Sequence, residues 1–226
     1  MIGAENKDKF NPPPVGGRGA VTIYIIRHGE TDLNKRGIVQ GRGLDTDLNE
    51  HGRLQAEAFH QTYKHIPFDF IYTSTLKRTH QTVDNFIKSD IPWEQFPGLD
   101  ELAWGIYEGR ENSIENRKAF KELLNNWTTG NLDFKFENGE SPNEVKLRQL
   151  EVIKKLKEHS GNQNILICMH GRALRLFLCL LTNISATEME QFPHQNTCLY
   201  KVKYDGENFT IIDFDNIDHL KHILPN

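Results

Sequence analysis

The sequence predicts an α/β fold in which helices cover a mostly parallel sheet. Three short runs carry this prediction, because each is almost wholly apolar, rich in β-branched residues, and followed by a polar loop or a helical pattern. These runs are Val21–Ile26, Phe68–Thr73 and Asn164–Met169. Strands without a polar face are typical of sheets that helices cover on both sides.

Helices are expected after each of these strands. A polar, glycine-bearing loop follows the first strand, and Asn49 is a suitable N-cap for a helix with Ala56, Phe59 and Tyr63 on one stripe. The second strand leads directly into a helix that begins near Thr75. The third strand is followed at once by a helix over 172–181.

A helical insertion is predicted between the second and third of these strands. One helix carries an apolar stripe that is typical of packing, formed by Phe120, Leu123, Leu124 and Trp127. A second begins at the capping box that starts with Ser141, and its inward side chains are Val145, Val152, Ile153 and Leu156. The same capping pattern from Ser185 to Glu188 predicts a further helix. Near the end, Asp205-Gly206 predicts a hairpin turn between two strands.

Residues 1–20 are predicted to be a flexible tail, because Pro12-Pro13-Pro14 and Gly16-Gly17 support neither a helix nor a strand. Residues 21–226 are expected to form a single domain, since no repeat or long linker interrupts them.

The composition excludes several classes of protein. A formal net charge of −4 argues against a general nucleic-acid binder, and the longest apolar run, near Leu174–Leu181, is too short to span a membrane. The N-terminus lacks the apolar core of a secretory leader. Three widely spaced cysteines predict reduced, buried thiols rather than disulfides or zinc. A cytoplasmic protein that contacts neither nucleic acid nor membrane is therefore expected.

Charged and imidazole side chains follow all three predicted buried strands. Arg27-His28 follows the first, Ser74 and then Arg78 follow the second, and His170-Gly171 follows the third. Ligands of such sheets bind beyond the carboxyl ends of the strands, so these groups are expected to meet at one rim.

Two histidines and two arginines at one site are suited to phosphoryl transfer. A neutral imidazole is a nucleophile, nearby arginines disfavour its protonation, and their guanidinium groups match phosphoryl oxygens. The chemistry rests mainly on positioning, and the sequence shows no metal-binding motif, so neither a metal nor another cofactor is expected. A carboxylic acid must still protonate the leaving group and activate water. Asp100 and Glu101 are the candidates, and the pattern alone leaves the choice between them open.

These residues resemble the signature of the histidine phosphatase superfamily, also called phosphoglycerate mutase-like. The matching segments lie between about residues 22 and 204: Arg27-His28-Gly29-Glu30-Thr31 with Asn34, Gln40-Gly41, Ser74 to Thr82, Leu99-Asp100-Glu101, Gly139-Glu140-Ser141, Met169-His170-Gly171 and Asn196-Thr197. The resemblance implies a three-layer α/β/α sandwich with a helical cap insertion at 104–140 that sets specificity.

The resemblance also implies a role for each matching residue. His28 would be the nucleophile, Glu101 the proton donor and then the base for water, and Arg27, Arg78 and His170 would hold the phosphoryl group. Implied further contacts to the substrate are Thr31, Asn34, Gln40, Gly41 and Gly171.

The expected activity is hydrolysis of a small phosphorylated metabolite, as in the α-ribazole and broad-specificity phosphatases. The alternative is a cofactor-dependent phosphoglycerate mutase. Family mutases carry paired arginines after a tryptophan, whereas Trp127 is followed by two threonines, and acids outnumber bases from Glu111 to Glu140. A non-catalytic protein that binds phosphorylated ligands is a second alternative. The sequence leaves a homodimer open and does not identify the leaving group.

Overall fold

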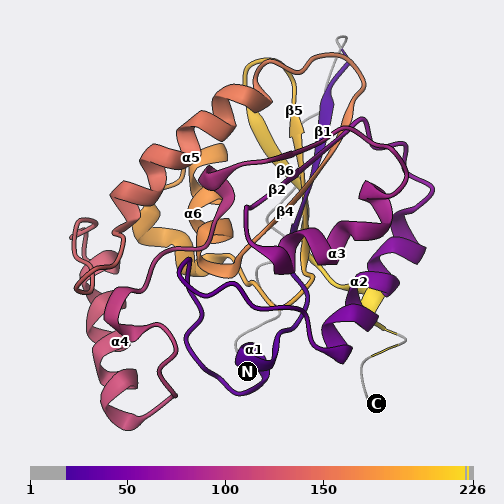
Figure 1. Cartoon of the computed structure of the whole chain (residues 1–226). Helices are drawn as coiled ribbons and strands as arrows, with labels where there is room; N and C mark the ends of the chain where they lie inside the picture. Colours follow the sequence, from indigo (N-terminus) through magenta and orange to yellow (C-terminus); the bar gives the residue numbers. More distant parts are fainter. Residues whose placement is uncertain (1–18, 222, 224–226) are drawn as a thin grey trace.

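The computed structural model describes residues 19–221 and 223 (Figure 1). The predicted tail therefore lies almost entirely outside the described residues. A six-stranded sheet forms the centre, in the order β3-β2-β4-β1-β5-β6. The strands are β1 (Val21–Arg27), β2 (Phe70–Thr73), β3 (Trp93–Gln95), β4 (Asn164–Met169), β5 (Leu199–Tyr204) and β6 (Phe209–Asn216). Strands β1 to β4 run parallel to one another, β5 pairs antiparallel with β1, and β6 pairs antiparallel with β5, which confirms the mostly parallel sheet.

Helices cover both faces of the sheet, so the predicted three-layer sandwich is confirmed (Figure 1). They are α1 (Asp32–Lys35), α2 (Glu50–Tyr63), α3 (Lys77–Ile87), α4 (Ile114–Thr128), α5 (Pro142–Leu156) and α6 (Gly171–Leu181). Along β1, Ile23 and Ile25 join the core beneath α5 and α6, whereas Tyr24 and Ile26 join the core beneath α2 and α3. Alternate side chains of one strand thus fill two cores, which is why the strand has no polar face.

The cap segment consists of α4 and the loops beside it, and α4 lies next to the start of α6 and the segment Ala186–Gln191 (Figure 1). Leu123 and Trp127 are buried, so the stripe on α4 serves packing as predicted. The ring of Trp127 is stacked with that of Trp104, with ring centroids 6.1 Å apart. The Nε1 of Trp127 donates to the Phe134 carbonyl at 2.7 Å. Phe136 packs on Tyr107 with ring centroids 4.0 Å apart. These aromatic contacts tie α4 to the segment that follows Glu101 in sequence.

Most local predictions are confirmed and some are wrong. Asn49 caps α2, Ser141 forms the predicted capping box of α5, and the hairpin turns at Asp205 and Gly206. The helix expected after Ser185 is instead a 3₁₀ helix over Ala186–Gln191, because the Ser185 side chain accepts from the nearer Thr187 N–H.

Two further differences concern the segments around the rim. The loop expected after β1 contains the short helix α1, which a capping box between Thr31 and Asn34 begins. The helix expected near Thr75 begins at Lys77, since the Thr75 N–H donates to Asp100 instead. The edge strand β3 was not predicted.

All three cysteines are buried and free, as expected from their spacing. Within residues 19–221 and 223, we find no helix whose length and apolar character would allow it to cross a bilayer.

Candidate active site

The carboxyl ends of three neighbouring strands bring the predicted residues together. Strand β4 lies between β1 and β2, with Arg27 paired to Met169 and Thr73 paired to Cys168. His28, Ser74 and His170 each come one residue after these strands, so the register of the sheet places them side by side. The structure thus joins segments about 140 residues apart in the chain at the rim that the sequence predicts.

His28 presents a ring nitrogen with a free electron pair. The ring is 3 % exposed, and its Nδ1 lies 2.7 Å from the Gly29 carbonyl oxygen. A carbonyl oxygen only accepts hydrogen bonds, so we assign the proton to Nδ1 and the lone pair to Nε2. The Gly29 N–H in turn donates to the Thr82 hydroxyl at 2.9 Å, which fixes the turn that carries the histidine.

His170 is fixed in the other tautomer. Its Nδ1 accepts from Arg78 Nε at 3.1 Å, so its proton lies on Nε2, which is 2.7 Å from Ser74 Oγ. The ring is fully buried, and its centroid is 5.1 Å from that of His28. Both imidazoles are therefore held in defined orientations within reach of a common small group.

Both rings are uncharged at neutral pH. Burial lowers the pKa of His28 well below its ordinary value, and the charges of Arg78 and Arg27 lower it further. Burial and Arg78 act in the same direction on the pKa of His170. A neutral imidazole with an accessible lone pair is the form that can attack phosphorus.

Arg78 is a fully buried cation at the floor of the site. Its Nη1 donates to the Leu44 carbonyl at 2.7 Å, and its Nη2 donates to the Gly41 carbonyl at 3.3 Å. Burial lowers the pKa of Arg78 to about 10, while Glu101 opposes this, so the guanidinium remains charged at neutral pH. The loop carbonyls and His170 thus fix the plane of this cation.

Arg27 has a donor that lacks a partner. Its Nη1 donates to the His194 carbonyl at 2.6 Å, but within the described part of the chain its buried Nε has no hydrogen-bond partner. A Cβ added to Gly171 would lie 3.4 Å from this Nε and 3.4 Å from the His194 ring. The unpartnered donor therefore lies beside the start of α6, where an anionic oxygen could accept from it.

The structure separates the two candidate acids. Asp100 Oδ1 accepts from the backbone and side chain of Thr75 at 2.8 and 2.9 Å, and its Oδ2 accepts from Arg42 Nε at 3.1 Å. Oδ1 therefore fixes the loop that follows β2, and Oδ2 fixes Arg42 on the loop between α1 and α2. Asp100 thus holds these two loops together.

The carboxyl group of Glu101 lies beside the start of α6, the helix that directly follows His170. Its Oε1 accepts from the N–H groups of Leu102 and Ala173, each at 2.9 Å, and its Oε2 accepts from the Arg172 N–H at 3.1 Å. The side chain is 7 % exposed and acts electrostatically on Arg27 and Arg78. Of the two carboxyl groups, Glu101 acts on both Arg27 and Arg78, whereas Asp100 acts on Arg78.

The predicted substrate contacts form a supporting network. Thr31 is fully buried, and its hydroxyl donates to Gln40 Oε1 at 2.8 Å. Asn34 Oδ1 accepts from the Thr31 N–H at 3.3 Å and from Asn196 Nδ2 at 3.2 Å. The network thus holds the loops around His28. Direct contact of these side chains with a substrate stays a prediction.

The two predicted glycines contribute backbone and space. Gly171 begins α6, and Gly41 is buried with its carbonyl facing Arg78. A Cβ on Gly41 would lie 2.1 Å from Glu108 Oε1 and 2.8 Å from Trp104 Cδ1, so a larger residue would require these side chains to shift. Their contact with a substrate also stays a prediction.

Several residues near the site were not predicted as part of it. Ser74 orients His170, and Asn196 Nδ2 donates to the His28 carbonyl at 3.0 Å. Their positions in the matched segments could have indicated them. His194 gives no local signal, because its approach to Arg27 depends on how the loop before β5 folds back.

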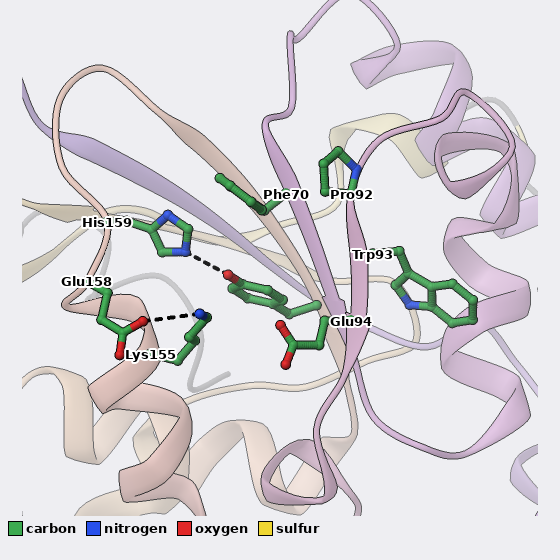
Figure 2. Close-up of a pocket in the computed structure, with 8 residues that line it drawn as sticks. Phe70, Pro92, Trp93, Glu94, Lys155, Glu158 and His159 are labelled. Atoms are coloured by element: carbon green, nitrogen blue, oxygen red, sulfur yellow. Dashed lines mark hydrogen bonds and ion pairs between the residues drawn. The ribbon is translucent and has the colours of Figure 1, made fainter.

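Two cavities lie outside the phosphoryl-binding candidates. One of about 460 Å³ borders the loop that holds Arg78 and is lined by Arg42, Gly43, Ala103, Gly105, Ile106, Glu108 and Asn138. Another, of about 320 Å³, lies at the edge of the sheet between β3 and α5, and Figure 2 shows Phe70, Trp93 and Lys155 around it. There the Tyr72 hydroxyl is 2.6 Å from His159 and Lys155 pairs with Glu158, so these polar groups satisfy one another.

Over the described ranges, 19–221 and 223, no group of three or more His, Cys, Asp or Glu side chains is arranged to hold a metal ion. A metal-independent reaction stays a prediction, which hydrolysis of a phosphate ester in the presence of EDTA tests.

Neutral, largely buried histidines make stability depend on pH. Burial lowers the pKa of His194 to about 3 and that of His219 to about 4, and the pKa values of His28 and His170 lie well below 6.5. Each contributes stability above its unfolded pKa of about 6.5, which is lost as the pH falls, by up to about 1.4 kcal/mol per unit. We expect the free energy of unfolding in urea to be several kcal/mol lower at about pH 5.5 than at about pH 7.

The variant His219→Gln is the control for this effect, because it removes one such proton site away from the candidate active site. Its free energy of unfolding is expected to change less with pH than that of the wild type. Equal stability of the wild type at both pH values would contradict the assignment of neutral buried imidazoles.

Comparison with known proteins agrees with this geometry. The sequence profile of the histidine phosphatase superfamily (branch 1) matches residues 23–217. The adenosylcobalamin/α-ribazole phosphatase of Salmonella typhimurium is 28 % identical over 180 residues, which cover 78 % of this chain and 87 % of that protein. Phosphoserine phosphatase 1 of Hydrogenobacter thermophilus is 24 % identical, covering 88 % and 94 %. The crystal structure of the α-ribazole phosphatase of Shigella flexneri superimposes with a TM-score of 0.74 at 26 % identity, covering 86 % and 96 %.

Proposed function

Because this chain belongs to the histidine phosphatase superfamily (branch 1), it is a phosphomonoester hydrolase, and we propose that it passes the phosphoryl group of a small metabolite through His28 to water. The observation that carries this mechanism is the tautomer of His28. Its Nδ1–H is engaged with the Gly29 carbonyl, so the lone pair of Nε2 is available at the rim of the sheet.

In the first step, Nε2 of His28 attacks phosphorus and the ester P–O bond breaks. The leaving oxygen takes a proton from Glu101, the carboxyl group at the start of α6. Arg78, together with the unpartnered Nε of Arg27, stabilises the charge on the transferring group. His170 donates its Nε2 proton to Ser74 Oγ and accepts from Arg78 Nε at Nδ1, so it holds the guanidinium group of Arg78 toward the phosphoryl group.

In the second step, water attacks the phosphohistidine and the P–N bond breaks. Glu101 accepts the proton of the attacking water, and inorganic phosphate leaves. The Nε2 lone pair of His28 is restored, so the cycle needs no other reactant.

The leaving group is expected to lie in the cavity of about 460 Å³ beside the Arg78 loop. Its lining combines the charged Arg42 and Glu108, the amide of Asn138 and the apolar Ile106, which suits a small polar metabolite. Two of the relatives are named for different substrates, so family membership does not identify the leaving group. Release of phosphate from a panel of metabolites tests it directly.

The assay that tests the function is hydrolysis of p-nitrophenyl phosphate in the presence of EDTA. We expect turnover that EDTA leaves unchanged, and no 2-phosphoglycerate when 3-phosphoglycerate is supplied with its bisphosphate. Binding without turnover would indicate a non-catalytic protein, loss of activity in EDTA a metal-dependent one, and formation of 2-phosphoglycerate a mutase.

We also propose a cytoplasmic location, which the three free, buried cysteines support because reduced thiols persist in that compartment. Cell fractionation tests it, and recovery outside the cytoplasm would overturn it. A homodimer stays a prediction, which light scattering of the purified protein tests.

A further inference from the structure

Arg148, on α5, reaches the backbone on both sides of Asp100 and Glu101. Its side chain is 14 % exposed. Its Nη1 donates to the carbonyls of Pro97, Gly98 and Asp100 at 3.1, 3.0 and 2.9 Å, and its Nη2 donates to the carbonyl of Glu101 at 3.1 Å. One guanidinium group therefore fixes the direction of the chain at four residues, up to and including the proposed acid.

The same guanidinium group is held on its other edge by Glu140. Arg148 Nε donates to Glu140 Oε1 at 3.0 Å, and Nη2 donates to Glu140 Oε2 at 3.2 Å. Glu140 in turn accepts from the Ala103 N–H at 2.9 Å and donates its own N–H to the Ala103 carbonyl at 2.8 Å. The segment 97–103 is thus held before and after Glu101, and both contacts depend on one ion pair.

We propose that Arg148 is the positioning residue for Glu101. Its charge acts on His170 from a distance, but its hydrogen bonds are to Glu140 and to the backbone around the acid, so it positions the acid through that backbone. The carboxyl group of Glu101 meets α6 at the N–H groups of Arg172 and Ala173, and this placement requires the Glu101 backbone to remain where Arg148 holds it. The inference rests on the proposed role of Glu101 as proton donor.

Only an arginine can make this set of contacts. Its planar fork offers five N–H donors in fixed directions, which here serve a carboxylate on one edge and four carbonyls on the other, with one Nη1 hydrogen shared between two carbonyls. A lysine would keep the charge next to Glu140 but could not serve both edges. Arg148→Lys should therefore leave the ion pair and release the segment that carries Glu101.

The experiment measures kcat/KM for a series of phosphate monoesters with good and poor leaving groups. A poor leaving group, such as an alkoxide, needs a proton from the acid, whereas p-nitrophenolate departs almost without one. For Arg148→Lys we expect kcat/KM to fall by about 10- to 100-fold for alkyl phosphates and by less than about threefold for p-nitrophenyl phosphate. The variant Glu101→Gln, which removes the acid, should show the same dependence with a larger amplitude.

Two further variants keep the outcome clear. Arg117→Lys, at an exposed arginine of α4, is expected to leave both classes of ester unchanged. Glu140→Gln weakens the ion pair with Arg148 and leaves the Arg148 side chain itself intact. We expect it to show the same dependence on the leaving group in smaller amplitude, so it replaces Arg148→Lys if that variant does not fold.

An equal loss of kcat/KM for all esters in Arg148→Lys and Glu140→Gln would overturn the inference, because general loosening of the fold does not distinguish leaving groups. If Glu101→Gln shows a larger loss of kcat/KM for poor leaving groups and these two variants do not, the proposed function stands and only the role of Arg148 is wrong. If Glu101→Gln itself affects all esters alike, the proposed role of Glu101 fails, and this inference fails with it.

Discussion

Replacing His28 by asparagine is expected to lower kcat/KM for p-nitrophenyl phosphate by at least about a thousandfold, because the reaction then lacks its nucleophile. Asparagine can still donate to the Gly29 carbonyl in place of Nδ1–H, so the turn after β1 should be preserved. The loss should appear in kcat/KM for every ester, whatever its leaving group. Steady-state kinetics and a thermal melt of the same preparation measure both effects.

The matched control is His65→Asn, at an exposed histidine that follows α2. It makes the same chemical change outside the site and should keep wild-type kcat/KM. Retention of more than about a tenth of the activity in His28→Asn would show that another group attacks phosphorus.

Replacing Arg78 by lysine is expected to lower kcat by about 100- to 1,000-fold, the usual effect of removing a preorganised donor to developing charge. The loss has two sources. The hydrogen bond from Arg78 Nε to His170 Nδ1 is lost, so the His170 ring is no longer held in its tautomer. In addition, the guanidinium group proposed to hold the phosphoryl oxygens is replaced by a single ammonium group. The substitution thus changes the position of the positive charge and the directions of its donors, although it keeps the net charge.

Lysine can replace only part of the bonds to the carbonyls of Gly41 and Leu44, so a fall of a few degrees in Tm is expected as well. Lys77→Ala, at the exposed neighbour on α3, is the control and should leave kcat unchanged. A kcat within about tenfold of wild type in Arg78→Lys would contradict the role of the guanidinium group.

The fold could be predicted where the local pattern of apolar residues in the sequence reflects burial directly. The β-branched runs ending at Arg27, Thr73 and Met169 lie inside the sheet, so each lacks a polar face, and the register of parallel strands then brings the following residues together. Helix starts at Asn49 and Ser141 were predictable because the capping side chain lies next to the backbone that it serves.

Elements that depend on distant partners were not predictable in this way. Strand β3 consists of three exposed residues, so no apolar pattern indicates it. The different partners of Asp100 and Glu101 depend on the positions of Thr75 and α6, which the local sequence does not give. Arg148 lies about 50 residues from the chain segment that it holds, and an arginine on an amphipathic helix gives no sign of such a partner.

Trapping the phosphorylated intermediate tests the central claim most directly. The enzyme would be quenched in alkali during turnover of a labelled phosphate ester, and the adduct located by mass spectrometry of its peptides. We expect one phosphoryl group on the imidazole of His28, stable in base, labile in acid, and formed at least as fast as kcat. An active preparation that carries no such adduct, or carries it on His170, would contradict this mechanism.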